Sequence, residues 1–199
     1  MNNYKSNIFI LLKRILLVVL IYQVSRILFY AMNSFSFHVL NLKTIKGGLL
    51  FDLSAIAFLN SICVIAHFIP GNFKYKTLYQ KYLKISFYAV NLLFIATNFI
   101  DIIYYKFTGR RSTFSMITAK GMEREAIGLI PSFLKEFWYV GLLFLVVALL
   151  FWKLLPNFNS KNPVEKLTKK DFVTQFSFLI LSIAVALLIA RGGFQKKPI

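Results

Sequence analysis

The chain has 199 residues, of which 58% are hydrophobic and 16% are charged, and its mean hydropathy is +0.65. Ordinary soluble domains are less apolar and carry more charge, so the composition argues against a soluble protein and predicts an integral membrane protein. A net charge of +17 would suggest nucleic-acid binding in a soluble protein, but here Lys and Arg flank apolar blocks, where they set topology and contact lipid headgroups.

Five apolar blocks follow one another along the chain. Each can cross a hydrocarbon core of about 30 Å as an α-helix, which rises about 1.5 Å per residue. Backbone groups in lipid must be hydrogen-bonded within their own segment, so helices are the expected spans. The sequence therefore predicts an all-α membrane protein, with a single transmembrane domain over residues 1–199 and a bundle of five helices at about 8–32, 48–69, 83–105, 137–155 and 172–190.

The connection between the third and fourth blocks is the longest. Its segment GMEREAIGLIPSFLKEFW, residues 121–138, places apolar residues among charges. This pattern is typical of a short helix lying in the membrane interface before the fourth span. A connecting helix packed on the protein is the alternative.

Basic residues divide evenly between the two sides of the membrane, twelve on each. The connections after the second and fourth blocks are short and nearly pure lysine, whereas the longest connection mixes acids with its bases. The first block has Lys13 and Arg14 at its start and only Arg26 at its end. Because Lys and Arg favour the cytoplasmic side, we expect the N-terminus inside and the C-terminus outside.

Charged residues lie near the outer ends of three blocks in this orientation. Arg26 is near the end of the first, Asp52 near the start of the second and Asp101 near the end of the third. A charge within a span costs a few kcal/mol at the bilayer centre and usually faces a partner inside the bundle. We therefore expect Arg26 to pair with Asp52 or with Asp101.

The third block carries a polar stripe on one helical face: Asn91, Asn98, Asp101 and Tyr105. The second block adds Asn60, and we expect such stripes to face each other and form interhelical hydrogen bonds. The sequence thus predicts an intramembrane polar network of Arg26, Asp52, Asn98 and Asp101. Three interpretations of its role stay open: helix packing, holding a polar lipid headgroup, and a path for protons or ions.

No catalytic or metal-binding constellation is visible. Cys63 is the only cysteine, and His38 and His67 are the only histidines, so metal-ligand spacing does not occur. We expect His67 to be a membrane-interface residue and not a ligand. Serines such as Ser112 have no histidine or metal to activate them. The sequence predicts no catalytic residue, metal or cofactor within this chain.

Four stretches resemble, in this order, the N-terminal membrane part of bacterial sulfatase-fold transferases, nearest to the lipoteichoic acid synthase-like family: GGLLFDLSAIAFLNS, NFIDIIYYKFTGRRSTFSM, FLKEFWYVGLLFL and ARGGFQKKPI. The resemblance implies five N-terminal helices followed by an extracytoplasmic domain of the alkaline phosphatase superfamily. Such a domain uses a threonine nucleophile and a divalent metal, and it transfers phosphoglycerol, phosphoethanolamine or a similar head group from a phospholipid.

The sequence stops at Ile199, and that catalytic domain has no counterpart in it. The resemblance therefore implies a membrane-anchoring and lipid-headgroup-presenting module of the bacterial plasma membrane, not catalytic by itself. Its expected partners are a membrane phospholipid and a missing or adjacent extracytoplasmic catalytic domain, which would hold the metal. The alternative is a stand-alone membrane scaffold or small transporter.

An arginine pair follows the third block at the expected outer interface. A guanidinium group matches phosphate oxygens with two parallel donors. Arg110 and Arg111 are therefore the residues predicted to contact a lipid phosphate. The alternative is an ordinary pair of interface cations.

Overall fold

The computed structural model describes residues 2–37, 42–112, 135–158 and 168–190, which form helices and turns without any strand. The predicted interfacial helix at 121–138 lies largely outside these residues. The described helices are α1 (Asn2–Met32), α2 (Leu42–Leu59), α3 (Ser61–Phe68), α4 (Thr77–Thr108), α7 (Trp138–Leu154) and α8 (Lys169–Ala190), with short 3-10 helices at Ser34–Ser36 and Asn72–Tyr75.

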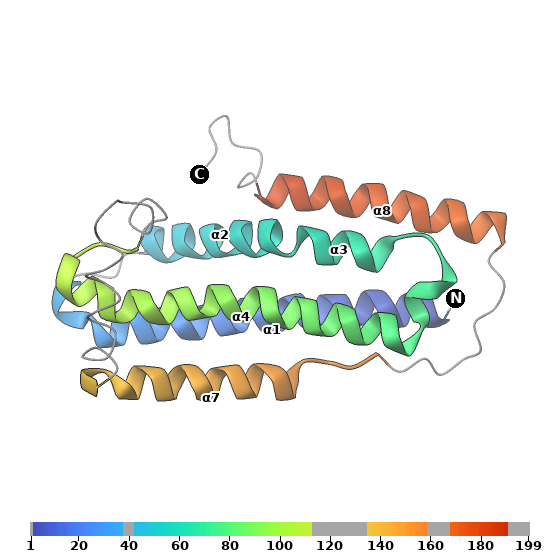
Figure 1. Cartoon of the computed structure of the whole chain (residues 1–199). Helices are drawn as coiled ribbons and strands as arrows, with labels where there is room; N and C mark the ends of the chain where they lie inside the picture. Colours follow the sequence, from blue (N-terminus) through green and yellow to red (C-terminus); the bar gives the residue numbers. More distant parts are fainter. Residues whose placement is uncertain (1, 38–41, 113–134, 159–167, 191–199) are drawn as a thin grey trace, which may run out of the picture.

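The helices form an elongated bundle around α1 and α4, which run side by side in the same direction (Figure 1). Helix α7 packs along α4 and α1 on one side. The consecutive helices α2 and α3 pack on the other, and α8 lies outermost against α2 and α3. With α2 and α3 taken together, each helix runs in the opposite direction to the helix before it (Figure 1). The end of α1 and the start of α2 therefore lie at the same end of the bundle.

Among the described residues, three helices are long and apolar enough to cross a membrane: Tyr4–Met32, Thr77–Thr108 and Asp171–Leu188. The second predicted block, at 48–69, is not one straight helix, because α2 and α3 meet at a bend of 54°; counted together they give a fourth candidate span. Helix α7 has 17 residues, or about 25 Å at 1.5 Å per residue, and is a shorter apolar helix. The described part of the chain therefore has three to four candidate spans, and the five predicted spans are not confirmed.

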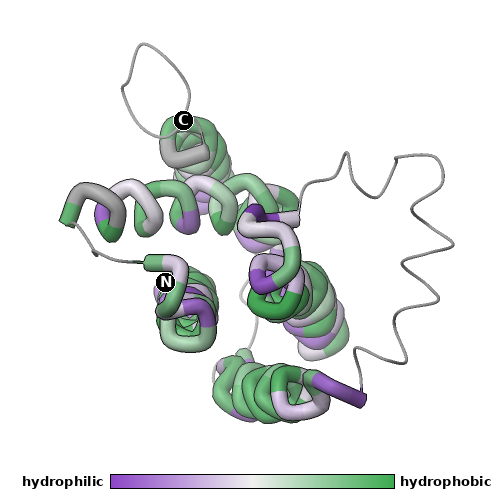
Figure 2. Tube along the Cα trace, turned by 90° about the vertical axis from the view of Figure 1, so that its left-hand side faces the viewer, coloured by the Kyte–Doolittle hydropathy of each residue, from purple (hydrophilic) through white to green (hydrophobic). Residues whose placement is uncertain are grey.

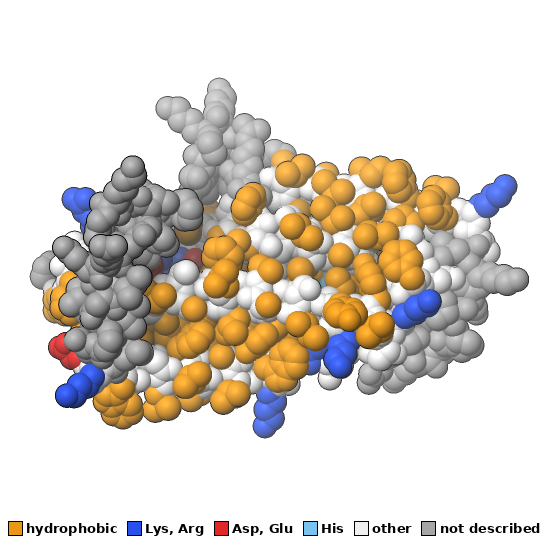
Figure 3. Space-filling view, viewed as in Figure 1, with side chains coloured by type: hydrophobic (Ala, Val, Ile, Leu, Met, Phe, Trp, Pro, Cys, Tyr) orange, Lys and Arg blue, Asp and Glu red, His pale blue; other side chains and the backbone are white. Residues whose placement is uncertain are grey.

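Hydrophobic side chains cover most of the flank shown in Figure 3. On α1, for example, Leu16, Leu20 and Ile27 are more than half exposed, while the opposite face packs inside the bundle. The end-on view in Figure 2 shows hydrophobic residues around most of the circumference of the helices. Helices that are apolar all round belong either in a large core or in lipid, and these fit a multi-pass membrane protein.

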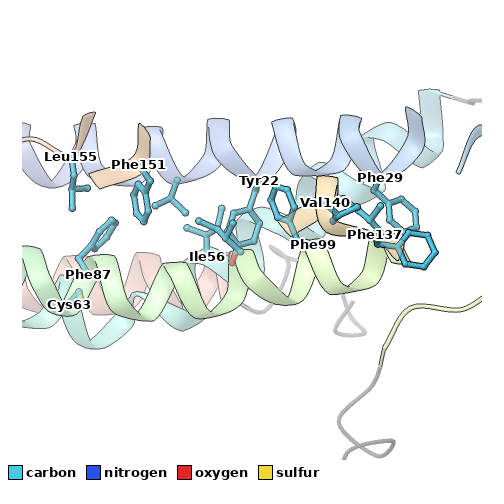
Figure 4. Close-up of a cluster of buried hydrophobic side chains, with 13 residues drawn as sticks. Tyr22, Phe29, Ile56, Cys63, Phe87, Phe99, Phe137, Val140, Phe151 and Leu155 are labelled. Carbon is cyan, nitrogen blue, oxygen red and sulfur yellow. The ribbon is translucent and has the colours of Figure 1, made fainter. Parts of the chain in front are cut away.

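The interior is a cluster of interdigitated apolar side chains contributed by α1, α2, α3, α4 and α7 (Figure 4). Val18 of α1, Phe87 and Ile95 of α4 and Phe151 of α7 are fully buried in it. This packing holds α1, α4 and α7 together along their length. The ion pair and the arginine clusters described below lie toward the two ends of this apolar core, whereas the Asn60–Asn91 pair lies within it.

The bend between α2 and α3 is centred on Asn60. Its side-chain amide donates to the carbonyl of Ile56 at 2.9 Å, which also accepts the Asn60 backbone N–H at 3.0 Å. Polar side chains that compete for helix carbonyls bend helices. The same amide exchanges two hydrogen bonds with Asn91 of α4, at 3.0 and 2.7 Å, so the bend is attached to α4.

Candidate functional site

Arg26 of α1 and Asp52 of α2 form an ion pair inside the bundle. The Nη2 atom of Arg26 donates to Oδ1 of Asp52 at 2.6 Å and its Nε atom donates to Oδ2 at 3.0 Å. The amide of Gln23 adds a third donor to Asp52 Oδ2 at 3.0 Å. The side chains of Arg26 and Asp52 are 13% and 10% exposed, so this two-pronged pair is largely shielded from solvent and its charges cancel.

Gly48 lets the guanidinium group of Arg26 reach the backbone of α2. Nη2 of Arg26 donates to the Gly48 carbonyl at 2.8 Å, and a Cβ at position 48 would lie 1.9 Å from Nη1. Any side chain here would displace Arg26 from Asp52. The neighbouring Gly47 meets nothing within 4 Å. Sequence reasoning missed this requirement, because a glycine in an apolar block gives no indication of what approaches it.

Asp101 does not pair with Arg26, although the sequence left that pairing open. Its Oδ1 accepts the backbone N–H of Ser112 at 2.9 Å and also accepts the Ser112 hydroxyl. The side chain is buried near the end of α4. It therefore ties the segment that follows α4 back onto the helix.

The structure separates the two arginines of the predicted pair. The guanidinium carbon of Arg111 lies 4.5 Å from the centre of the Phe29 ring on α1, a cation–π geometry, and Arg111 is partly buried. Arg110 is exposed. Arg111 is thus turned toward the bundle.

A pocket of about 400 Å³ lies between the end of α1, the start of α2 and the end of α4. Its lining combines two arginines with aromatic rings and glycines: Arg26, Phe29, Tyr30, Phe37, Gly47, Gly48, Phe51, Tyr105 and Arg111. A narrow recess beside it is lined by Asn98 and Asp52 together with the same two arginines. The predicted residues Arg26, Asp52, Asn98 and Arg111 therefore meet at one place.

A second polar cluster, which the sequence analysis did not predict, lies at the opposite end of the bundle. Arg14 is fully buried; its Nε and Nη2 atoms donate to the carbonyl of Pro156 at 3.4 and 3.1 Å, and its Nη1 atom lies 3.1 Å from Nε2 of His67. Nδ1 of His67 donates to the Cys63 carbonyl at 2.7 Å, so Nε2 is free to accept from Arg14. His67 is fully buried, so it packs inside the bundle, and its predicted position at the membrane interface stays a prediction.

Lys74, in the turn between α3 and α4, connects α8 to this cluster. Its Nζ atom donates to Oε1 of Gln175 at 2.9 Å and lies 5.1 Å from the ring centre of Tyr4. Burial lowers the pKa of Lys74 from 10.5 to about 8. The contact fixes the start of α8 against the turn, and Gln175 within the fifth apolar block was the only signal of it.

Within the described part of the chain, no group of three His, Cys, Asp or Glu side chains is placed to hold a metal ion. Comparison with protein families, with curated proteins and with solved structures found no match for this chain.

Proposed function

We propose that the chain is a multi-pass membrane module that holds the phosphate of a phospholipid headgroup in the pocket between α1, α2 and α4. The observation that carries this proposal is that the guanidinium groups of Arg26 and Arg111 line one pocket at one end of an apolar bundle. Guanidinium groups bind phosphate oxygens through paired donors. Lipid phosphates lie at the end of the hydrocarbon region, where this pocket would open.

The charge of the lining favours an anion. Asp52 neutralises Arg26, whereas Asp101 accepts two neutral donors from Ser112. The positive charge of Arg111 is therefore left without an ion-pair partner among the described residues. The lining, which does not include Asp101, carries one net positive charge from Arg26, Arg111 and Asp52, and a phosphate anion would pair with that charge.

We further propose that α7 completes five crossings, with the N-terminus in the cytoplasm and the C-terminus outside a bacterial plasma membrane. The alternating direction of successive helices (Figure 1) supports this arrangement. So do Trp138 and Trp152 near the two ends of α7, because tryptophan favours the membrane interface. The pocket would then face the outer leaflet.

A role in a larger enzyme rests on the sequence resemblance alone. In this proposal the chain anchors an extracytoplasmic sulfatase-fold domain of the lipoteichoic acid synthase-like type and presents it with a phospholipid. That domain would supply the threonine nucleophile and the divalent metal, and it would transfer phosphoglycerol, phosphoethanolamine or a similar group. This chain would supply the membrane anchor and the phosphate contact.

A small transporter is the second candidate, and the bend of 54° between α2 and α3 favours it. Transporters often bind their substrates at broken helices near the middle of the membrane. Here, however, the Asn60 and Asn91 amides at the bend hydrogen-bond to each other. They therefore offer a substrate fewer free donors than the arginines do.

Titration of the purified protein in detergent with dihexanoyl phosphatidylglycerol tests the phosphate site. We expect Arg111→Gln to weaken binding about tenfold, because a hydrogen bond to a charged group contributes about 1.5–3 kcal/mol. Arg111→Lys should restore part of the loss, since lysine keeps the charge but loses the planar pair of donors. The exposed Arg110→Gln is the matched control and should bind like the wild type.

Generic attraction between basic residues and an anionic lipid gives a different result. It is screened by salt and depends little on which cation is removed. The phosphate site would be overturned if Arg110→Gln and Arg111→Gln lost the same amount of lipid affinity and if neither variant differed from the wild type at high salt. Glycerol 3-phosphate, titrated in parallel, separates binding of a lipid from binding of a soluble phosphate.

A further inference from the structure

We infer that Asp101 is a positioning residue for the pocket. By accepting hydrogen bonds from Ser112, Asp101 holds the guanidinium group of the neighbouring Arg111 in place. The placement of Arg111 follows from contacts within the chain. Its consequence for lipid binding rests on the proposed function. The two acids at this end of the bundle then have different roles, since Asp52 neutralises an arginine and Asp101 orients one.

The end of α4 turns the chain back toward Asp101. Gly109 has a φ of +64° and its N–H donates to the Tyr105 carbonyl at 2.9 Å, a helix end that glycine permits without strain. The backbone N–H of Arg110 then donates to the hydroxyl oxygen of Thr108 at 3.3 Å. The turn brings Ser112 to a carboxylate eleven residues earlier in the sequence.

The Ser112 contact determines which arginine faces the bundle. Asp101 accepts both the backbone N–H and the hydroxyl of Ser112, and hydrogen bonds to a carboxylate are stronger than those between neutral groups. Arg111 is the residue next to Ser112, and it lies over the Phe29 ring at 4.5 Å. Arg110, one residue further away, is exposed.

The donors that Asp101 uses explain how it orients Arg111 without cancelling its charge. Both belong to Ser112 and both are neutral, and the ion pair seen among the described residues is Arg26–Asp52. A direct carboxylate–guanidinium pair would occupy the donors that a phosphate needs. A bond through the neighbouring residue leaves the guanidinium group of Arg111 able to bind an anion.

Chemical modification by phenylglyoxal, followed residue by residue with mass spectrometry on the purified full chain, tests the placement without any lipid. In the wild type we expect Arg111 to react about fivefold more slowly than Arg110, the effect of a cation–π contact at a partly buried site. Asp101→Ala should abolish this difference. Asp101→Asn should keep most of it, because an amide oxygen still accepts from Ser112.

A matched control separates positioning from general loss of stability. Asp171 accepts from the Thr168 hydroxyl at the start of α8, at 2.6 Å, so Asp171→Ala removes a carboxylate from the other end of the bundle. It should leave the protection of Arg111 unchanged. Equal reactivity of Arg110 and Arg111 in the wild type, or protection of Arg111 that survives Asp101→Ala, would overturn the inference.

Lipid affinity then links the placement to the pocket. If Asp101 acts through Arg111, the double variant Asp101→Ala/Arg111→Gln should bind dihexanoyl phosphatidylglycerol no more weakly than Arg111→Gln alone. Additive losses would assign Asp101 a separate role and contradict the inference. If Asp101→Ala removes the protection of Arg111 from phenylglyoxal but Arg111→Gln binds lipid like the wild type, Asp101 still positions Arg111 and the phosphate site is rejected.

Discussion

The ion pair between Arg26 and Asp52 combines shielding from solvent with three donors to one carboxylate. Such a pair contributes little net stability compared with two well-packed apolar residues, because both charges lose hydration. Removing one member is a larger perturbation, since the remaining charge is left without a partner in a poorly hydrated layer. The pair is thus best tested by a double-mutant cycle and not by single substitutions.

We predict that Asp52→Leu lowers the free energy of unfolding by about 3 kcal/mol, the usual cost of leaving a buried charge unpaired. Adding Arg26→Leu should recover part of that loss. Thermal melting in detergent measures both changes. Strictly additive losses would show that the two side chains are not coupled.

Gly48 tests the same contact from the side of α2. Alanine has the higher helix propensity by about 1 kcal/mol, so an uncrowded Gly→Ala change in α2 should be stabilising. Gly47→Ala, with nothing within 4 Å of its Cβ, should therefore leave the melting temperature unchanged or raise it. Gly48→Ala should lower it by displacing Arg26; a rise at both positions would contradict the described approach of the guanidinium group.

Individual residues differ in how much of their role the sequence could predict. Arg26, Asp52 and Asn98 could be assigned to one layer from their distance to the block ends. The Asp101–Ser112 contact could not, because it depends on a left-handed backbone conformation at Gly109. The contact of Arg14 with Pro156 was equally hidden, since it joins residues 142 positions apart.

Helical elements show where hydropathy patterns are informative and where they fail. Long apolar blocks predicted α1, α4 and α8 well, and the structure mainly extends α1 and α4 beyond the predicted ends. The bend at Asn60 was not predicted. A single asparagine barely changes the mean hydropathy of a window, yet its amide competes for a helix carbonyl.

The Asn60–Asn91 contact should stabilise the bend against α4. We predict that Asn91→Leu destabilises the protein by about 1–2 kcal/mol, because it leaves the buried Oδ1 atom of Asn60 without the Asn91 donor. The double variant Asn60→Leu/Asn91→Leu should be more stable than Asn91→Leu, as judged by thermal melting. A double variant that loses the sum of both single changes would mean that the two amides act independently.

Lys74, which holds α8 to the turn before α4, gives a prediction on pH. Its folded pKa of about 8 lies below the ordinary 10.5, so the unfolded chain binds the extra proton between these values. Unfolding free energy should therefore rise from pH 8 toward pH 10 relative to a Lys74→Met variant. Melting temperatures of the two proteins across this range measure it, and parallel curves would contradict a buried lysine.

In the whole molecule, two polar clusters lie toward opposite ends of an apolar core, and the Asn60–Asn91 pair lies between them. One end contains Arg14, His67 and Lys74. Arg14 joins α1 to α3 and to the turn after α7, and Lys74 joins the turn before α4 to α8. The other end contains the pocket and a positive charge that is not paired within the described residues. Composition and block lengths could predict an all-α membrane protein. They could not predict the location of a pocket, because it depends on how three helix ends meet.

Orientation can be tested independently of the pocket. Reporter fusions after Lys76 should give a cytoplasmic signal and fusions after Ala190 an external one, if the helices alternate across the membrane as proposed. The basic connections on the cytoplasmic side are the physical reason. Signals from the same side at both positions would reject the proposed five crossings.

The proposed function depends on the arginine-lined pocket holding a phospholipid by its phosphate. Native mass spectrometry of the protein released from membranes tests it most directly, because it counts bound lipids of known mass on each folded variant. We predict one retained phospholipid for the wild type and for Arg110→Gln, and its loss from Arg111→Gln. Equal retention by Arg111→Gln and the wild type would contradict the claim.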